Sequence, residues 1–380
     1  MSIDIKKYFE ELETFVNIDS GSYDVAGLDR AADYLEGLYR EEGLFVTRRA
    51  LGDRRIPHIV ATPHDPAGLT GKEKPWDIMF IGHFDTVFPE GTVAERPFSI
   101  EDGKVKGPGA ADMKAGDLMS LYLIKELRKE FPDKCFAIVN NSDEELGSPD
   151  SGDLLVEISG NAKYAFDMEP GRITGNFVKE RKGAVEYWVE THGKASHAGN
   201  APEKGAHAIY EMARWLLCCE KLNNSDPGLT VSPGLITGGT ASNTIPDYCQ
   251  IKVDVRIVDP AQKKIVEDAF DELVANPTVK GVTSSYIKYS DMPPMRFTAG
   301  TAKMVGILTE EAQKMDYHFD FESAGGASDA SFVSGGGTPV LDACGPHGEG
   351  LHSAAEYFFY DTVVPRYELI AGCIRRLLAE

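Results

Sequence analysis

The sequence predicts an α/β protein in which a domain built on a mostly parallel sheet is interrupted by an inserted α+β domain. Two observations carry this prediction. Continuous apolar strands alternate with helical patterns up to residue 181 and again from residue 293. Between these stretches, apolar and polar residues alternate along the strands, as in sheets with one face in solvent. We therefore expect one discontinuous domain, 1–181 with 293–380, and a second domain at 182–292.

The first segment is expected to begin with two amphipathic helices and to continue with buried strands. Its elements are, in order, helices at 4–18 and 26–42, strands at 43–50, 56–62 and 77–83, a helix at 113–130, a strand at 135–140, a helix at 149–159 and a strand at 163–168. The apolar run at 77–83 is typical of strands covered on both faces. Leu118, Leu121, Ile124 and Leu127 recur at helical spacing, which predicts the helix at 113–130.

Strict alternation characterises the insert, and along 248–257 apolar residues occupy every second position. The expected order is a strand at 184–190, a helix at 205–222, strands at 229–237 and 248–257, a helix after Pro260 and a strand at 281–289. This β-α-β-β-α-β order is the ferredoxin-like arrangement. The α/β pattern then resumes with a helix at 300–315, a strand at 317–322, a turn at Gly335–Gly337, a strand at 339–343 and a helix at 361–379.

The charge balance excludes several classes of function. The chain has 39 Lys and Arg against 60 Asp and Glu, a net charge of −21, which repels nucleic-acid backbones and anionic membranes as partners. No apolar run approaches the ~18–20 residues of a membrane span, and the N-terminus lacks a signal-peptide core, so we expect a cytoplasmic protein. The six cysteines form no Cys-x-x-Cys pair, which favours reduced thiols over a disulfide framework or a zinc–thiolate site.

Five strand-to-loop junctions of the α/β segments carry imidazole or carboxylate groups. They hold His83 with Asp85, Asp112, the run Asp143–Glu145, Glu169, and His352. Taken alone, each could have a purely structural role, such as a helix N-cap for Asp112 or a solvated acidic turn for Asp143–Glu145. Because ligands bind beyond the carboxyl ends of parallel strands, we expect these groups to meet at one sheet edge. Imidazole and carboxylate without thiolate suit zinc, cobalt or manganese, and a shared carboxylate suits a pair of ions.

These residues lie in segments that resemble the di-zinc aminoacylase and carboxypeptidase family, which includes glutamate carboxypeptidase, acetylornithine deacetylase and succinyl-diaminopimelate desuccinylase. The resemblance extends over nearly the whole chain. Its segments are Gly82–Val87, Gly107–Gly109, Asp112–Lys114, Asp143–Ser148, Glu169-Pro170, Gly193–Gly199, Asn243–Pro246, Asp254–Arg256, Gly325–Ala330, His352-Ser353 and Glu356-Tyr357. The Glu-Glu-Leu-Gly-Ser, Phe-Asp-Met-Glu-Pro and Ala-Glu-Tyr segments resemble the glutamate carboxypeptidase-like members most.

The resemblance implies two Zn²⁺ per subunit, with Co²⁺ or Mn²⁺ as possible substitutes. The implied metal ligands are His83 and Glu169 for one ion, Glu145 and His352 for the other, and Asp112 for both. Asp85 would orient His83, and the peptide bond after Asp112 is often cis in the family. A hydroxide that bridges the ions would attack an amide carbonyl, with Glu144 as the general acid and base.

In the family, the insert joins two subunits, and a histidine of one subunit stabilises the oxyanion in the site of the other. That histidine is here His197, while Asn243, Arg256 and Gly326 resemble positions that hold the substrate. The resemblance thus implies a homodimer that acts on a small peptide or N-acyl amino acid and releases a C-terminal amino acid, as glutamate carboxypeptidase does. An N-acyl-amino-acid deacylase is the alternative, and a catalytically silent metal-binding dimeric scaffold is a third reading.

Overall fold

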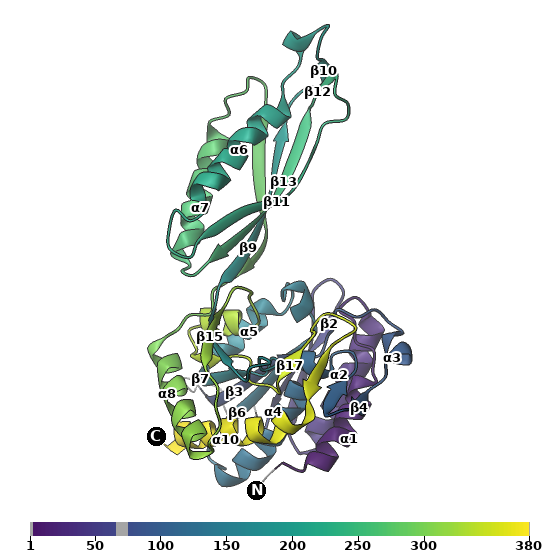
Figure 1. Cartoon of the computed structure of the whole chain (residues 1–380), viewed down its shortest axis with the longest axis vertical. Coiled ribbons are helices and arrows are strands. Elements are labelled where there is room, and N and C mark those ends of the chain that lie inside the picture. Colours follow the sequence, from purple (N-terminus) through teal and green to yellow (C-terminus); the bar gives the residue numbers. More distant parts are fainter. Residues whose placement is uncertain (1–2, 66–74, 380) are drawn as a thin grey trace. The chain divides into compact units, whose positions relative to one another are not determined.

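The computed structural model describes residues 3–65 and 75–379 and divides the chain into two compact units (Figure 1). The larger unit takes the chain up to Glu180 and again from Phe297, and the smaller unit takes Arg181–Arg296. Three residues of the later segment, Gly325–Ala327, group with the smaller unit. The expected domain boundaries did not assign residues 325–327 to the smaller unit, because three loop residues carry no periodic pattern.

A six-stranded sheet forms the centre of the larger unit, in the order β1-β2-β6-β3-β7-β16. Its strands are β1 (Phe45–Leu51), β2 (Ile56–Thr62), β3 (Trp76–His83), β6 (Phe136–Asn141), β7 (Ala162–Asp167) and β16 (Val340–Leu341). The four strands from β6 to β16 pair in parallel, while β1 and β2 add an antiparallel edge. The predicted α/β class with a mostly parallel sheet is therefore confirmed, and the carboxyl ends of β3, β6 and β7 lie at one edge of this sheet.

Helices surround this sheet, and most of them contribute to a continuous apolar core (Figure 1). They are α1 (Ile5–Val16), α2 (Val25–Glu41), α3 (Thr92–Glu95), α4 (Ala115–Glu130), α5 (Gly152–Ser159), α8 (Ala299–Lys314), α9 (Ala330–Gly335) and α10 (Val363–Ala379). Helix α2 contacts β1 and β2, and α4 contacts β3 and β6. The side chains of Asp4, Asp24 and Thr298 cap the N-termini of α1, α2 and α8 by accepting backbone N–H groups, as helix caps do.

Short elements complete the larger unit. The strands β4 (Ser99–Glu101), β5 (Lys104–Lys106), β17 (Gly348–Glu349) and β18 (Tyr357–Phe359) form a second sheet, and β8 (Phe177–Arg181) pairs with β15 (Phe321–Ala324). Most of these were not predicted, because two or three residues are too few to show a period. Helix α9 was also not predicted, whereas the expected turn follows it, with Gly337 at a φ of 90°.

The smaller unit is ferredoxin-like, as predicted. Its elements are β9 (Gly183–His192), α6 (Ala208–Leu222), β11 (Thr230–Gly238), β13 (Tyr248–Ile257), α7 (Ala261–Ala275) and β14 (Thr283–Met292). The antiparallel sheet has the order β11-β13-β9-β14, with α6 and α7 together on one face (Figure 1). A short ladder of β10 (Ser196–His197) and β12 (Thr244–Ile245) extends from it. Its apolar core is separate from that of the larger unit.

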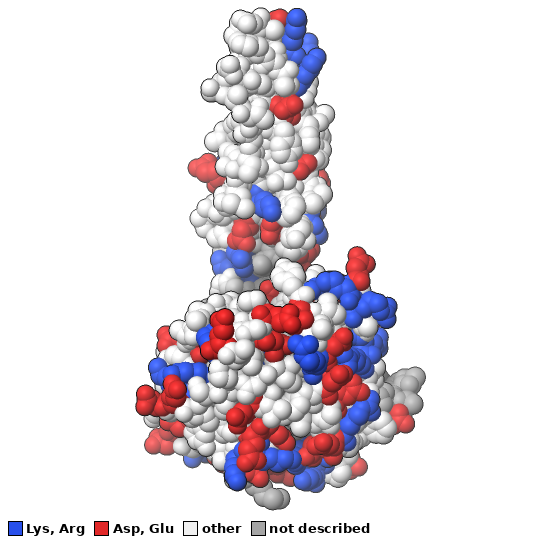
Figure 2. Space-filling view, turned by 90° about the vertical axis from the view of Figure 1, so that its right-hand side faces the viewer, with Lys and Arg blue, Asp and Glu red and all other residues white. Residues whose placement is uncertain are grey.

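Acidic and basic side chains are interspersed on the visible surface of the larger unit (Figure 2). Such mixing is typical of a solvated surface rather than of a surface that binds a polyanion. Among the residues that the structure describes, no helix has the length and apolar character needed to cross a membrane.

The core of the smaller unit depends on one aromatic cluster. The buried ring of Phe270 on α7 lies 5.5 Å from Tyr187, 5.2 Å from Trp215 and 5.5 Å from Tyr286, measured between ring centroids. Removing this ring leaves a cavity that three neighbours cannot fill. We predict that Phe270→Ala lowers the free energy of unfolding of this unit by about 3–5 kcal/mol.

Hydrogen exchange of the full chain, followed by mass spectrometry, measures this effect. Amides of β9 and β13 should exchange faster in Phe270→Ala, while amides of β3 and β6 should keep their protection because they belong to the other core. Ile265→Ala is the control, since Ile265 lies on the same helix and is 41% exposed. Equal acceleration in β3 and β9 would contradict the separation of the two cores.

Candidate active site

The predicted site residues of the larger unit meet at the carboxyl edge of the main sheet. His83 is the last residue of β3, and Glu169 follows β7. Glu144 and Glu145 form a short turn after β6. Asp112 lies in the turn Ala110–Lys114, which leads into α4, and its peptide bond to the next residue is cis. The parallel strands bring these distant segments together, as the position of ligands in open α/β sheets requires.

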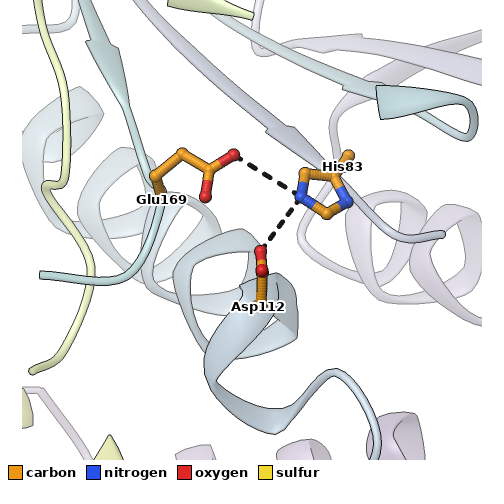
Figure 3. A group of neighbouring side chains, drawn as sticks. All are labelled: His83, Asp112 and Glu169. Carbon is orange, nitrogen blue, oxygen red and sulfur yellow. Dashed lines mark ion pairs between the residues drawn. The ribbon is translucent and has the colours of Figure 1, made fainter. Parts of the chain in front are cut away.

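His83, Asp112 and Glu169 form a first group of converging side chains. The Nε2 atom of His83 lies 3.2 Å from Oδ1 of Asp112 and 3.5 Å from Oε1 of Glu169, and the three side chains point toward one another (Figure 3). All three are buried, and Nε2 has no well-directed hydrogen-bond partner. A buried ring nitrogen that faces two carboxylates without a hydrogen bond fits a metal ligand.

Asp112, Glu145 and His352 form a second group. The Nε2 atom of His352 lies 3.2 Å from Oδ2 of Asp112 and 3.0 Å from Oε2 of Glu145. Asp112 therefore offers one oxygen to each group, and the ligand atoms within each group lie within 4.8 Å of one another. One carboxylate shared by two sets of donors is the usual frame of a two-metal site.

Electrostatics shows how crowded the negative charge is. Burial opposes ionisation of Asp112, but the close imidazoles of His352 and His83 outweigh it and lower the pKa of Asp112. The carboxylates of Asp112 and Glu145 raise the pKa of His352 to about 10. Burial and the charge of Asp112 raise the pKa of Glu169 to about 7. Such a cluster is relieved by positive charge, so its donors fit one or two divalent cations.

Asp85 holds several parts of the site. The Nδ1 atom of His83 lies 3.1 Å from the main-chain oxygen of Asp85 and 3.3 Å from its Oδ1. A proton on Nδ1 leaves the lone pair of Nε2 for a cation. The carboxylate also accepts the backbone N–H groups of Glu144 and Glu145, at 3.2 and 3.3 Å, and the hydroxyl of Ser22 at 2.7 Å. The family resemblance implied only the link to His83, because nothing local in the sequence relates residue 85 to residues 22 or 144.

Glu144 belongs to neither group of candidate ligands. Its Oε2 lies 3.9 Å from Nε2 of His83. Burial raises the pKa of Glu144 well above its usual value, and the carboxylates of Glu169, Asp329 and Glu145 add to this effect, although His83 opposes it. A carboxyl group whose pKa is raised and whose oxygens accept no hydrogen bond among the described contacts is suited to exchange protons. The neighbouring Asp143 differs, since it accepts hydrogen bonds from the backbone of Asp150 and from Ser151, and its position is structural.

Glu356 was not singled out as a site residue, although it lies in one of the segments that carried the resemblance. Its buried carboxylate accepts the backbone N–H groups of Ala111 at 2.9 Å, Asp112 at 3.2 Å and Gly109 at 3.4 Å. It therefore holds the turn that carries Asp112. No spacing in the sequence could reveal this contact, because the partners are more than 240 residues apart.

His347 is not one of the converging side chains. Its Nε2 is 2.7 Å from the hydroxyl of Tyr317, and burial lowers its pKa to about 4. His352, and not His347, therefore supplies the imidazole of the second group.

The smaller unit holds the four residues expected to contact substrate. His197 and Asn243 are neighbours, because β10 pairs with β12 and the N–H of Ala198 donates to the carbonyl of Asn243. Arg256 lies elsewhere, near the other end of β13, and pairs with Asp254 on its own strand. The carbonyl of Gly326 accepts a hydrogen bond from Arg181 at 3.1 Å. The structure thus brings His197 and Asn243 together but not Arg256.

Comparisons with known proteins agree with this architecture. The family model described as Peptidase dimerisation domain matches residues 179–282. Carboxypeptidase G2 of Pseudomonas sp. (strain RS-16) is 30% identical over 382 residues, covering 96% of this chain and 88% of the relative. Succinyl-diaminopimelate desuccinylase of Aliarcobacter butzleri (strain RM4018) is 29% identical over 298 residues, covering 73% and 78%.

Solved structures show the same fold. Aminopeptidase PepT of Bacillus cereus ATCC 10987 superposes with a TM-score of 0.77 at 22% identity and covers 99% of each chain. An M20 family metallo-carboxypeptidase of Sulfolobus solfataricus superposes with a TM-score of 0.71 at 17% identity and covers 98% of each chain. Similarity of sequence along the whole length, a matching domain model and a shared fold all agree, and the chain belongs to the M20 family of metallopeptidases and related amidohydrolases.

Proposed function

We propose that this enzyme is a metal-dependent carboxypeptidase-like hydrolase, which cleaves an amide bond to release a C-terminal amino acid from a small peptide or N-acyl amino acid. The observation that carries the proposal is the Asp112 carboxylate, which is shared by two imidazole–carboxylate groups, with the carboxyl group of Glu144 beside them but in neither. The similarity to Carboxypeptidase G2, which extends over most of both chains, supports the carboxypeptidase type.

The donors suit two zinc ions, and imidazole with carboxylate also suits Co²⁺ or Mn²⁺. His83 and Glu169 would hold one ion, Glu145 and His352 the other, and Asp112 both. When bound, such ions supply Lewis-acid activation of an amide carbonyl and of water.

The remaining steps belong to the chain itself. Glu144 takes a proton from the attacking water and gives it to the leaving amine, so that each turnover returns it to its starting state. The Asp85 carboxylate accepts the backbone N–H groups of Glu144 and Glu145 and so holds the turn that carries the Glu144 side chain.

We also propose that the smaller unit joins two copies of the chain and that His197 serves the site of the partner copy. The match to a peptidase dimerisation domain supports the first part. For the second part, Nδ1 of His197 accepts the N–H groups of Gly199 and Asn200, at 3.1 and 3.0 Å, which leaves the proton on Nε2. An Nε2–H group is the donor that a developing oxyanion needs. Asn243 beside it is a proposed substrate contact, and Arg256 and Gly326 remain predictions.

A deacylase is the second candidate, because the similarity to a succinyl-diaminopimelate desuccinylase covers most of both chains. A substrate panel separates the two activities. We expect the zinc-loaded enzyme to release C-terminal amino acids from N-blocked peptides and N-acyl amino acids, to lose activity with a chelator and to regain it with Zn²⁺ or Co²⁺. Hydrolysis restricted to acetylated or succinylated amines would favour the deacylase, and a fully metal-loaded enzyme without any hydrolysis would favour a silent scaffold.

Glu144→Gln tests the proton-transfer role. The amide keeps the shape of the side chain but cannot exchange a proton, so kcat should fall by about 10²–10⁴-fold. Metal content, measured by plasma mass spectrometry, should stay near that of the wild type because Glu144 is in neither ligand group. Glu157→Gln, which removes one exposed charge on α5, is the control. Near-native turnover with full metal content would refute the assignment.

Glu356→Gln tests how the shared carboxylate is held. The variant loses one of the two acceptor oxygens that hold the turn of Asp112, so metal affinity should fall by about 10–100-fold. Chelator competition measures this directly, and saturating metal should restore much of the activity. Glu349→Gln is the matched control, because Glu349 is exposed on β17 and bonds only the Tyr357 hydroxyl among the contacts described. Unchanged metal affinity in Glu356→Gln would show that the turn holds Asp112 without it.

A further inference from the structure

The turn that carries Glu144 and Glu145 ends at two residues in the left-handed backbone region. Gly147 has a φ of 84° and Ser148 a φ of 52°. Glycine adopts this conformation freely, whereas a serine there brings its Cβ atom close to the backbone and is strained. The Asp85 carboxylate holds the start of the turn through two backbone N–H groups. The strained end of the turn needs a contact of its own.

Asp329 supplies this contact. The Ser148 hydroxyl donates to its Oδ1, and Nδ2 of Asn141 donates to its Oδ2 at 2.6 Å. All three side chains are buried, so a donor that lost its acceptor here would stay without a partner at a cost in free energy. Asn141 is the last residue of β6, from which the chain enters the turn. Asp329 therefore joins the strand that leads into the turn to the residue at which the turn ends.

The place of Asp329 in the chain makes this contact unusual. It stands at the N-cap position of α9, where an aspartate commonly accepts a backbone N–H of its own helix. Its side chain makes no such hydrogen bond and instead reaches residues 181 and 188 positions earlier. The contact with the distant turn thus replaces the usual capping role. The family resemblance of the segment Gly325–Ala330 assigned no role to this residue.

The neighbours of Asp329 attach it to the main sheet. The Ser328 hydroxyl donates to Asp342 at 2.9 Å and lies 3.2 Å from Asp167, which also accepts the N–H of Ala330 at 3.0 Å. Asp167 ends β7 and Asp342 follows β16. Both carboxylates are buried. The segment is therefore held by rigid elements, which lets Asp329 fix whatever its side chain binds.

We propose that Asp329 is a positioning residue for the turn of Glu144 and Glu145, and that it acts through the hydroxyl of Ser148. This inference rests on the proposed function, in which Glu145 holds an ion together with His352 and Glu144 moves the proton. Without the contact, the left-handed end of the turn relaxes and both carboxylates leave their places. The first group of candidate ligands lies on other segments and keeps its geometry.

Zinc titration of the metal-free full chain against a chelator dye tests this role without any turnover. His352→Ala identifies the binding event that belongs to the second group. Asp329→Asn replaces one of two acceptor oxygens by a donor, so the affinity of this event should fall about 10–100-fold while the other event stays unchanged. Ser148→Ala, which removes only the hydroxyl, should weaken the same event. Asp153→Asn, at an exposed residue of α5, is the control.

Glycine at position 148 separates positioning from a general structural role. Glycine takes the left-handed conformation without help from a hydrogen bond. In the Asp329→Asn background, Ser148→Gly should therefore restore most of the lost zinc affinity, whereas Ser148→Ala should not. If Asp329 served only to hold α9, the two double variants would behave alike, and that result would overturn the inference.

Kinetics at saturating zinc show whether Glu144 is displaced as well. In Asp329→Asn, kcat should fall about 10–100-fold and KM should change by less than about twofold, because a misplaced proton carrier affects the transition state more than substrate binding. If the zinc pattern holds but the wild type cleaves no substrate, the proposed function fails while the positioning role stands. Equal weakening of both zinc-binding events, or unchanged affinity in both Asp329→Asn and Ser148→Ala, would refute that role.

Discussion

The Asp112 carboxylate reaches two imidazoles at once, with Oδ1 beside His83 and Oδ2 beside His352. Because both groups of candidate metal ligands share this carboxylate, it sets the distance between them, and the rest of the site is arranged around it. The turn that carries Asp112 must stay in place, and the Glu356 carboxylate holds it by three backbone N–H groups. The Glu356 carboxylate is not a candidate metal ligand, but by binding the backbone it fixes the position of the Asp112 carboxylate between the two groups.

Much of the main sheet could be predicted because its strands are buried on both faces. Expected strands at 77–83 and 135–140 agree with β3 and β6 to within a residue or so, and period-two alternation predicted β13 over its full length. Strands of two or three residues, such as β17, carry too little pattern to be recognised. Tertiary packing decides how such short strands pair, and the pattern of a few neighbouring residues carries no information about that packing.

The same division applies to the site. His83 and Glu169 could be expected to meet because both follow parallel strands, whose carboxyl ends lie at one sheet edge. Ser22 and Glu356 could not, because their partners are far away in the chain and a lone hydroxyl or carboxyl group has many ordinary readings. Arg256 was expected only to contact the substrate, and this stays a prediction, because in the structure the residue lies apart from Asn243 and pairs with Asp254 on its own strand.

The two groups of donors differ in their access to water. His83, Asp112 and Glu169 are all buried, whereas the His352 side chain is 57% exposed. An ion held by the inner group could leave only if the protein around it opened, but an ion at the outer group could exchange through solvent. Dilution or a weak chelator would therefore empty the outer position first. In a cell, the inner ion would behave as part of the folded chain, and the outer ion would follow the free-metal concentration of its surroundings.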